Sequence, residues 1–170
     1  MEYRLRFVPK AMKNRVIFTK FRKEQELELL DLWRKSFHRA VGIEEDTRPE
    51  VLREHLEFLQ SLDPVFIRVA VEKDSGKIVG FMRMEGNVIK DLFIHVDYQR
   101  QGLGSRFIRQ AKEENEFLSL STYELNKGAQ IFYELHHFVI TERGFASFVD
   151  NPWATNKEQL AEITYEWRKG

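Results

Sequence analysis

The chain has 170 residues, of which 42% are hydrophobic and 13% aromatic, enough to bury one sizeable core. Its 27 basic residues balance 27 acidic ones, so no net charge favours nucleic acid or an anionic membrane as a partner. Cysteine is absent, which excludes disulfides, zinc–thiolate centres and thiol catalysis. No apolar run approaches the roughly 20 residues of a membrane span, and no signal-peptide core is present, so we expect a cytoplasmic protein.

The first 23 residues carry an excess of positive charge. Eight basic side chains stand there against Glu2 alone. Such a run is typical of a solvated tail and first strand, while a nucleic-acid or substrate-entry surface is the alternative. We place a basic N-terminal extension at residues 1–12 and a single domain at residues 13–170.

Strand-like and helix-like patterns alternate near the start of the chain. Residues 3–8 and 15–21 have strand composition and favour a hairpin, although the first run is also compatible with a loose extension. From residue 27, apolar positions recur every three or four residues, which predicts an amphipathic helix ended by Gly42. Thr47 and Glu50 then have capping-box spacing. They predict a second helix, with Pro49 in its first turn and Pro64 after its end.

The middle of the chain has three successive strand patterns, and the short turns between them favour an antiparallel meander. After it, helix and strand patterns alternate. The expected strands are 65–71, 77–84, 87–96, 117–123, part of 137–149 and 162–167, and the expected helices are 104–114 and 126–136. This order predicts an α/β fold, with helices on both faces of a mixed sheet.

The stretch DYQRQGLGSRF, from Asp97 to Phe107, places two glycines between an expected strand and an expected helix. A helix N-terminus attracts phosphate, and glycine lets the ligand approach the backbone. A tight strand-to-helix turn without a ligand is the alternative. The dinucleotide-binding fingerprint is disfavoured because Phe107 replaces its third glycine, and the P-loop pattern is absent.

Two motifs in this chain resemble those of the GCN5-related N-acetyltransferase (GNAT) family. LFIHVDYQRQGLGSRFI is similar to the family's acetyl-CoA motif, in which a strand is followed by Q/R-x-x-G-x-G/A opening a helix. STYELNKGAQIFYELHHF is similar to a later block, whose Asn, Ala and Tyr correspond to Asn126, Ala129 and Tyr133. Two motifs in the family's order are more specific than either alone, and the resemblance covers about residues 13–169.

The resemblance implies a GNAT-like fold, whose central, mostly antiparallel sheet has a splayed pair of strands. It also implies an acetyl-CoA-dependent N-acetyltransferase, in which an amine attacks the thioester directly within a ternary complex and strand N–H groups polarise the carbonyl. Tyr133 matches the residue that protonates the departing thiolate, and packing beside Phe132 is its alternative role. The implied cofactor-binding residues are Leu92, Phe93, Ile94, Gln99, Arg100, Gln101, Gly102, Leu103, Gly104, Ser105, Arg106, Asn126, Ala129, Phe132 and Tyr133.

The group that deprotonates the amine is not evident, although many members of the family use Glu or His. The corresponding positions hold Val88, Lys90 and Ser121, none of which is an acid or an imidazole. Glu85, Asp91 or a water chain at Ser121 are the substitutes, with Asp91 one residue out of phase with the expected positions. No metal-ligand set is present, so we expect no metal.

Acceptor selection in this fold is expected to fall to the first two helices and to loops near the C-terminus. The acidic residues 44–46 favour either a cationic acceptor or a solvated loop. We expect a small-molecule amine rather than a protein, with no nucleic-acid or membrane partner, and a homodimer as in many members of the family. The alternative function is an acyl-CoA-binding module of the same fold with weak or lost catalysis.

Overall fold

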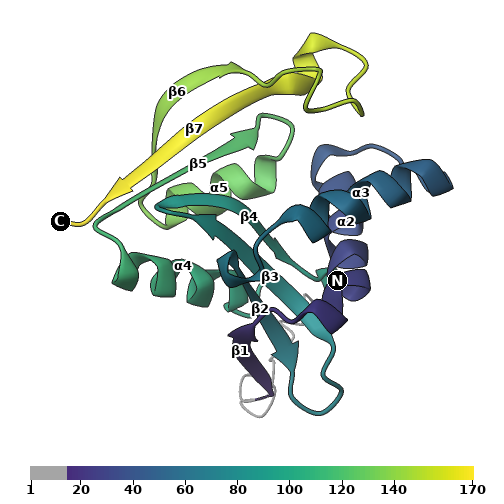
Figure 1. Ribbon diagram of the computed structural model, residues 1–170. Helices are drawn as coiled ribbons and strands as arrows, with labels where there is room; N and C mark the ends of the chain where they lie inside the picture. Colours follow the sequence, from purple (N-terminus) through teal and green to yellow (C-terminus); the bar gives the residue numbers. More distant parts are fainter. Residues whose placement is uncertain (1–14) are drawn as a thin grey trace, which may run out of the picture.

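The computed structural model describes residues 15–170, so the expected extension at 1–12 and the strand-like run at 3–8 lie outside the described residues. The strands form one seven-stranded sheet in the order β1-β2-β3-β4-β5-β7-β6 (Figure 1), in which only the β4–β5 pair is parallel. The strands are β1 Val16–Lys20, β2 Ile67–Glu72, β3 Ile78–Glu85, β4 Val88–Ile94, β5 Phe117–Tyr123, β6 Val139–Phe145 and β7 Ala161–Arg168. The α-helices are α2 Glu26–Val41, α3 Pro49–Ser61, α4 Leu103–Glu114 and α5 Lys127–Leu135.

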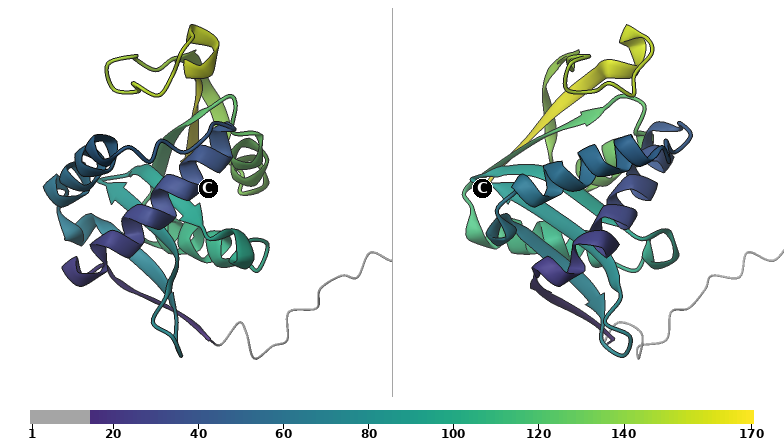
Figure 2. Two further views of the ribbon diagram at one scale, coloured as in Figure 1. Left: turned by 90° about the vertical axis from the view of Figure 1, so that its right-hand side faces the viewer. Right: turned by 45° about the vertical axis from the view of Figure 1, so that its right-hand side comes forward.

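Helices cover both faces of the sheet, which confirms the expected mixed α/β fold (Figures 1 and 2). On one face, Phe107 and Ile108 of α4 are fully buried in a core that also contains Tyr133 of α5. On the other face, Leu29 of α2 and Leu59 of α3 pack with side chains of β2 and β3 in a second core. The sheet thus separates two apolar clusters. No helix within residues 15–170 combines the length and apolar character needed to cross a bilayer.

The helix boundaries follow the sequence signals with one correction. Gly42 ends α2 in a left-handed conformation (φ 73°), and its N–H donates to the His38 carbonyl at 2.9 Å. The expected capping box of Thr47 is wrong, because the residue before a proline favours an extended conformation. Arg48 is therefore the N-cap of α3, with no side-chain cap, and the helix begins at Pro49. The helix ends at Ser61, before Pro64.

A buried arginine fixes the two helices of the second face relative to each other. Only 2% of Arg34 on α2 is exposed. Its guanidinium lies 3.4 Å from the Glu45 carboxylate, donates to the Asp46 carbonyl and contacts the His55 ring on α3. One side chain thereby holds α2, the following loop and α3 together.

We expect Arg34→Leu to lower the free energy of unfolding by about 3 kcal/mol, because it removes a buried guanidinium and leaves the partly buried groups that it binds without their partner. Arg48→Leu is the control, since it removes a guanidinium from an exposed pair with Asp46. Urea unfolding monitored by circular dichroism measures both. Equal midpoints for the two variants would contradict the structural role of Arg34.

Candidate functional site

The parallel strands β4 and β5 separate soon after they meet. Their one register pair is Val88 with Ser119, beside a 3.0 Å bond from the Ser119 N–H to the Asn87 carbonyl. Beyond it each strand stays paired only with its other neighbour, β3 or β7. The gap, which we call the central cleft, encloses about 370 Å³ including its open mouth. It is lined by Ile89, Lys90, Asp91, Leu92, Phe93, Leu120, Ser121, Thr122, Asn126, Ala129 and Tyr133.

One edge of β4 offers backbone groups to this cleft. The His95 N–H donates to Val79 of β3 at 2.8 Å. Because backbone groups alternate between the two edges of a strand, those of Ile94 and Leu92 point toward β5. The Gln99 side chain donates to the Ile94 carbonyl at 3.0 Å and so ties the following loop to the end of the strand. All three residues are sequence-predicted, and Leu92 lines the cleft, whereas Ile94 and Gln99 are not among its lining residues.

The loop from β4 to α4 forms a concave run of backbone N–H groups. Arg100 (φ 60°) and Gly102 (φ 86°) are both left-handed, and Gly102 is the N-cap of α4 without a side-chain cap. The first N–H groups of a helix have no partner within it, so those of Leu103, Gly104 and Ser105 can bind an anion. Gln101 stabilises this loop, which we call the cradle (residues 99–105), by donating to the Asp97 carbonyl at 3.3 Å.

Gly104 allows α4 to approach α5. A Cβ atom at this position would lie 3.1 Å from two carbons of the Phe132 ring. Any larger residue must therefore displace that ring, which packs beside the cradle. Arg106 also belongs to this region, with its guanidinium 4.1 Å from the centre of the Phe18 ring on β1.

Tyr133 and Asn126 come from α5. Tyr133 lines the central cleft and is only 6% exposed. Burial, and to a lesser degree the charge of Asp91, raise the pKa of its phenol, so it stays protonated near neutral pH. Asn126 caps α5, because its side-chain oxygen accepts from the Ala129 N–H at 3.1 Å. The Asn–Ala spacing of the second motif is thus also a helix cap.

A β-bulge changes the expected orientation of Asp91. Arg83 pairs with Asp91 and Met84 with Ile89, which leaves Lys90 as an extra residue in β4. Directly paired residues project to the same face, and Arg83 shares its face with Glu85. Their partners Asp91 and Val88 therefore share that face too. The expectation that Asp91 lies out of phase with Val88 is wrong, since the bulge adds one residue between them.

Arg83 is an ion-pair partner that the sequence analysis missed. Its Nε lies 2.6 Å from Asp91 Oδ2, and another guanidinium nitrogen lies 2.9 Å from Glu85 Oε1. Burial raises the pKa of Asp91, although the charge of Arg83 opposes this shift. Asp91 Oδ1 has no hydrogen-bond partner within residues 15–170. Glu85 lines neither this cleft nor the pocket described next, so Asp91 is the better-placed of the two carboxylates.

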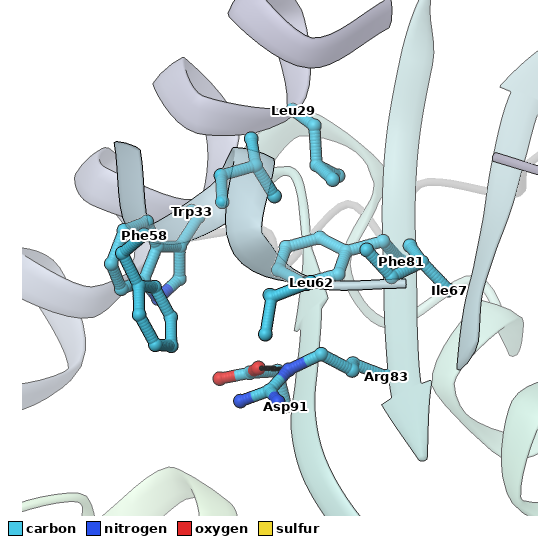
Figure 3. Close-up of a pocket in the computed structure, with 9 residues that line it drawn as sticks. Leu29, Trp33, Phe58, Leu62, Ile67, Phe81, Arg83 and Asp91 are labelled. Atoms are coloured by element: carbon cyan, nitrogen blue, oxygen red, sulfur yellow. Dashed lines mark hydrogen bonds and ion pairs between the residues drawn. The ribbon is translucent and has the colours of Figure 1, made fainter. Parts of the chain in front are cut away.

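A second pocket lies on the face covered by α2 and α3 (Figure 3), and we call it the helix-side pocket. It encloses about 300 Å³ including its opening. It is lined by Leu29, Trp33, Phe58, Leu59, Leu62, Ile67, Phe81, Arg83 and Asp91. Asp91 lines this pocket and the central cleft, so its carboxylate is where the two spaces meet. Among the described residues, no group of three or more His, Asp or Glu side chains is arranged to hold a metal ion.

Comparisons with known proteins agree with this geometry. The profile of the acetyltransferase (GNAT) domain matches residues 65–140. The peptidyl-lysine N-acetyltransferase YjaB of Salmonella typhimurium is 31% identical over 134 residues, which are 78% of this chain and 89% of that protein. The solution structure of Escherichia coli YjaB superimposes with a TM-score of 0.67, at 23% identity, over 89% of this chain and 97% of the other.

Two further proteins are similar over different lengths. Streptothricin acetyltransferase A of Bacillus subtilis is 38% identical over 85 residues, 47% of this chain and 46% of that protein. The PaiA N-acetyltransferase of Thermoplasma acidophilum, solved with coenzyme A, has a TM-score of 0.63 at 14% identity and covers 91% and 99% of the two chains. The chain therefore belongs to the GCN5-related N-acetyltransferase family and is an acetyl-CoA-dependent N-acetyltransferase.

Proposed function

We propose that this enzyme transfers the acetyl group of acetyl-CoA to a primary amine of a small molecule, in the cytoplasm, by direct attack in a ternary complex. The observation that carries the proposal is the placement of Tyr133 in the central cleft, with Asp91 at the junction to the helix-side pocket. An acyl donor in the cleft and an amine in the pocket would then meet beside both groups.

The residues of the cleft fit acetyl-CoA. Backbone groups of Leu92 and Ile94 face the space in which a pantetheine arm would lie, and the cradle N–H groups suit the pyrophosphate. When bound, acetyl-CoA supplies an activated thioester. The free backbone N–H groups of β4 are placed to donate to the oxygen that gains negative charge during attack.

Tyr133 acts as the proton donor in this proposal. An ordinary thiol has a pKa of about 8.5 and an ordinary phenol one of about 10, so full proton transfer from the phenol to a free thiolate is uphill. Burial in the same cleft raises the pKa of the phenol as well as that of the departing sulfur, so the transfer stays uphill. The phenol therefore first stabilises the thiolate by donating a hydrogen bond, and the proton follows as the charge develops.

Asp91 acts as the base, through the oxygen that Arg83 does not occupy. Its raised pKa makes it a better proton acceptor than an exposed aspartate, while its charge attracts an ammonium group. The acceptor class is supported by the pocket, because a partly enclosed, largely apolar space suits a small ligand better than an extended protein chain. Relatives named for peptidyl-lysine and for streptothricin indicate that both protein and small-molecule acceptors occur in the family.

We expect Tyr133→Phe to lower kcat by 100-fold or more, because a general acid typically accelerates a reaction by about 10²–10⁴-fold. The Kd for acetyl-CoA should stay the same. Thiol release with a panel of primary amines measures turnover, and calorimetry measures binding. Tyr165→Phe is the matched control, because Tyr165 is buried 6.2 Å away, ring to ring, and its hydroxyl has no hydrogen-bond partner within residues 15–170. An unchanged kcat in Tyr133→Phe would refute the assigned role.

Gly102→Ala should weaken acetyl-CoA binding about 5- to 30-fold, because a left-handed alanine costs about 1–2 kcal/mol. The variant relieves this strain by turning the cradle N–H groups away from the ligand position. Binding of acetyl-CoA must then restore their orientation, at a cost in affinity. Gly76→Ala is the control, since Gly76 has a similar φ of 71° in the β2–β3 turn, outside the site. Calorimetry should give a wild-type Kd for Gly76→Ala. A weakening of equal size in both variants would argue against the cradle.

The pH dependence of kcat/KM tests Asp91. Its carboxylate is the active form, so the rate rises with pH through its pKa, which lies above the usual value of about 3.9. An alkylamine with a pKa near 10 is an ammonium ion throughout the range from pH 4 to 7 and gives its proton to Asp91, so it adds no slope of its own in the wild type. Over that range we expect the slope of log kcat/KM against pH to fall from 1 to 0 in the wild type and to stay at 1 in Asp91→Asn, where only the neutral amine can react. If the change in slope of the pH profile persists in Asp91→Asn but disappears in Glu85→Gln, Glu85 is the base instead.

A further inference from the structure

The walls of the helix-side pocket are apolar except at one end. Leu29, Leu59, Ile67 and Phe81 form its buried part, each 7% exposed or less. The rings of Trp33 and Phe58 lie 6.1 Å apart at an angle of 34°. Figure 3 shows these rings on one side and the Arg83–Asp91 pair at the other end. A ligand that fills this space must have an apolar body with one polar end.

The charged side chains at the polar end of the pocket determine which polar group of a ligand can bind there. Arg83 is already bound to the carboxylates of Asp91 and Glu85, and Lys90 lines the central cleft together with Asp91, so these four side chains carry no net charge. The selective group is therefore the free oxygen of Asp91, which can accept a hydrogen bond from an ammonium group that lies next to the central cleft.

The apolar walls disfavour an acceptor with several positive charges. A second ammonium group among these side chains would lose its hydration without gaining a partner. The acidic residues that might have served a polycation are already paired, because Glu45 binds Arg34 and Asp46 binds Arg48. The contacts of Glu45 and Asp46 therefore do not favour the expectation that residues 44–46 attract a cationic acceptor.

The aromatic wall is held in place by the buried arginine. Trp33 packs edge-on against His55, with ring centres 5.3 Å apart, and His55 contacts Arg34. Phe58 lies beside Trp33 and near Arg83, yet 46% of it is exposed. An exposed phenylalanine that also lines a pocket presents apolar surface that a ligand can cover.

We infer that the acceptor is a monoamine with an apolar substituent, and that Trp33 and Phe58 contact and select this substituent. The inference rests on the proposed function, because it places the amine of that reaction at Asp91. It assigns the chemical class of the acceptor and two specificity-determining residues.

The experiment compares phenethylamine, ethylamine and spermidine as acceptors for the full chain, with acetyl-CoA saturating. We expect kcat/KM for phenethylamine to exceed that for ethylamine at least 10-fold, since one methylene in an apolar pocket is worth about 10- to 200-fold. Spermidine should react no better than ethylamine. Phe58→Ala should remove most of the preference for phenethylamine over ethylamine.

Phe148→Ala is the matched control, because Phe148 is 49% exposed and lines neither the cleft nor the pocket. Equal or higher rates with spermidine, or a preference for phenethylamine that survives in Phe58→Ala, would overturn the inference and leave the proposed function intact. If no amine is acetylated, the proposed function fails by itself. Calorimetry then measures binding of phenethylamine to the enzyme with CoA. Binding that is lost in Phe58→Ala but kept in Phe148→Ala supports the inferred ligand class of the helix-side pocket. Absence of binding to the wild type overturns the inference.

Discussion

The early separation of β4 from β5 is the constraint on which the rest of the site depends. Each strand keeps its antiparallel neighbour, so the sheet remains continuous through a single register pair while two facing edges stay free. Unpaired backbone groups are unfavourable in a dry interior, which requires that this space be open to water or filled by a polar ligand. α4 and α5 close one side of the gap. The same feature thus weakens the sheet and provides the site.

The bulge in β4 solves an electrostatic problem in the hairpin. If the strands paired without a bulge from the turn onward, Arg83 would lie opposite Lys90. Like charges directly opposite each other are unfavourable. The extra residue shifts the register so that Arg83 faces Asp91 instead. The gain is a partly buried ion pair at the junction of the two spaces. The unfavourable pairing of Arg83 with Lys90 in a regular hairpin is therefore a feature of the sequence that indicates a bulge and the Arg83–Asp91 pair.

Local features of the sequence predicted most of the fold. Helix periods, Gly42 and the two motifs each depend on residues close together in the chain, and the helices and strands formed near the expected positions. The cofactor residues could be named for the same reason, and five of them, Leu92, Phe93, Asn126, Ala129 and Tyr133, line one cleft. Asp91, Arg83 and the helix-side pocket depend on strand register and on contacts between α2, α3 and the sheet. These contacts join residues far apart in sequence, such as Trp33, Phe58 and Phe81, and a periodic pattern carries no information about them.

In the proposed function, the two spaces divide the tasks of the enzyme between the faces of the sheet. Most of the motif residues lie on or toward α4 and α5, whereas Phe93 packs against Phe81 on the helix-side face. The helix-side pocket is made by α2 and α3, whose positions depend on the Arg34 contacts rather than on any motif. Side chains there can change without disturbing the cleft, so acceptor choice can vary while the chemistry is kept. Asp91 is the one side chain that lines both spaces, and a substitution there must affect both tasks.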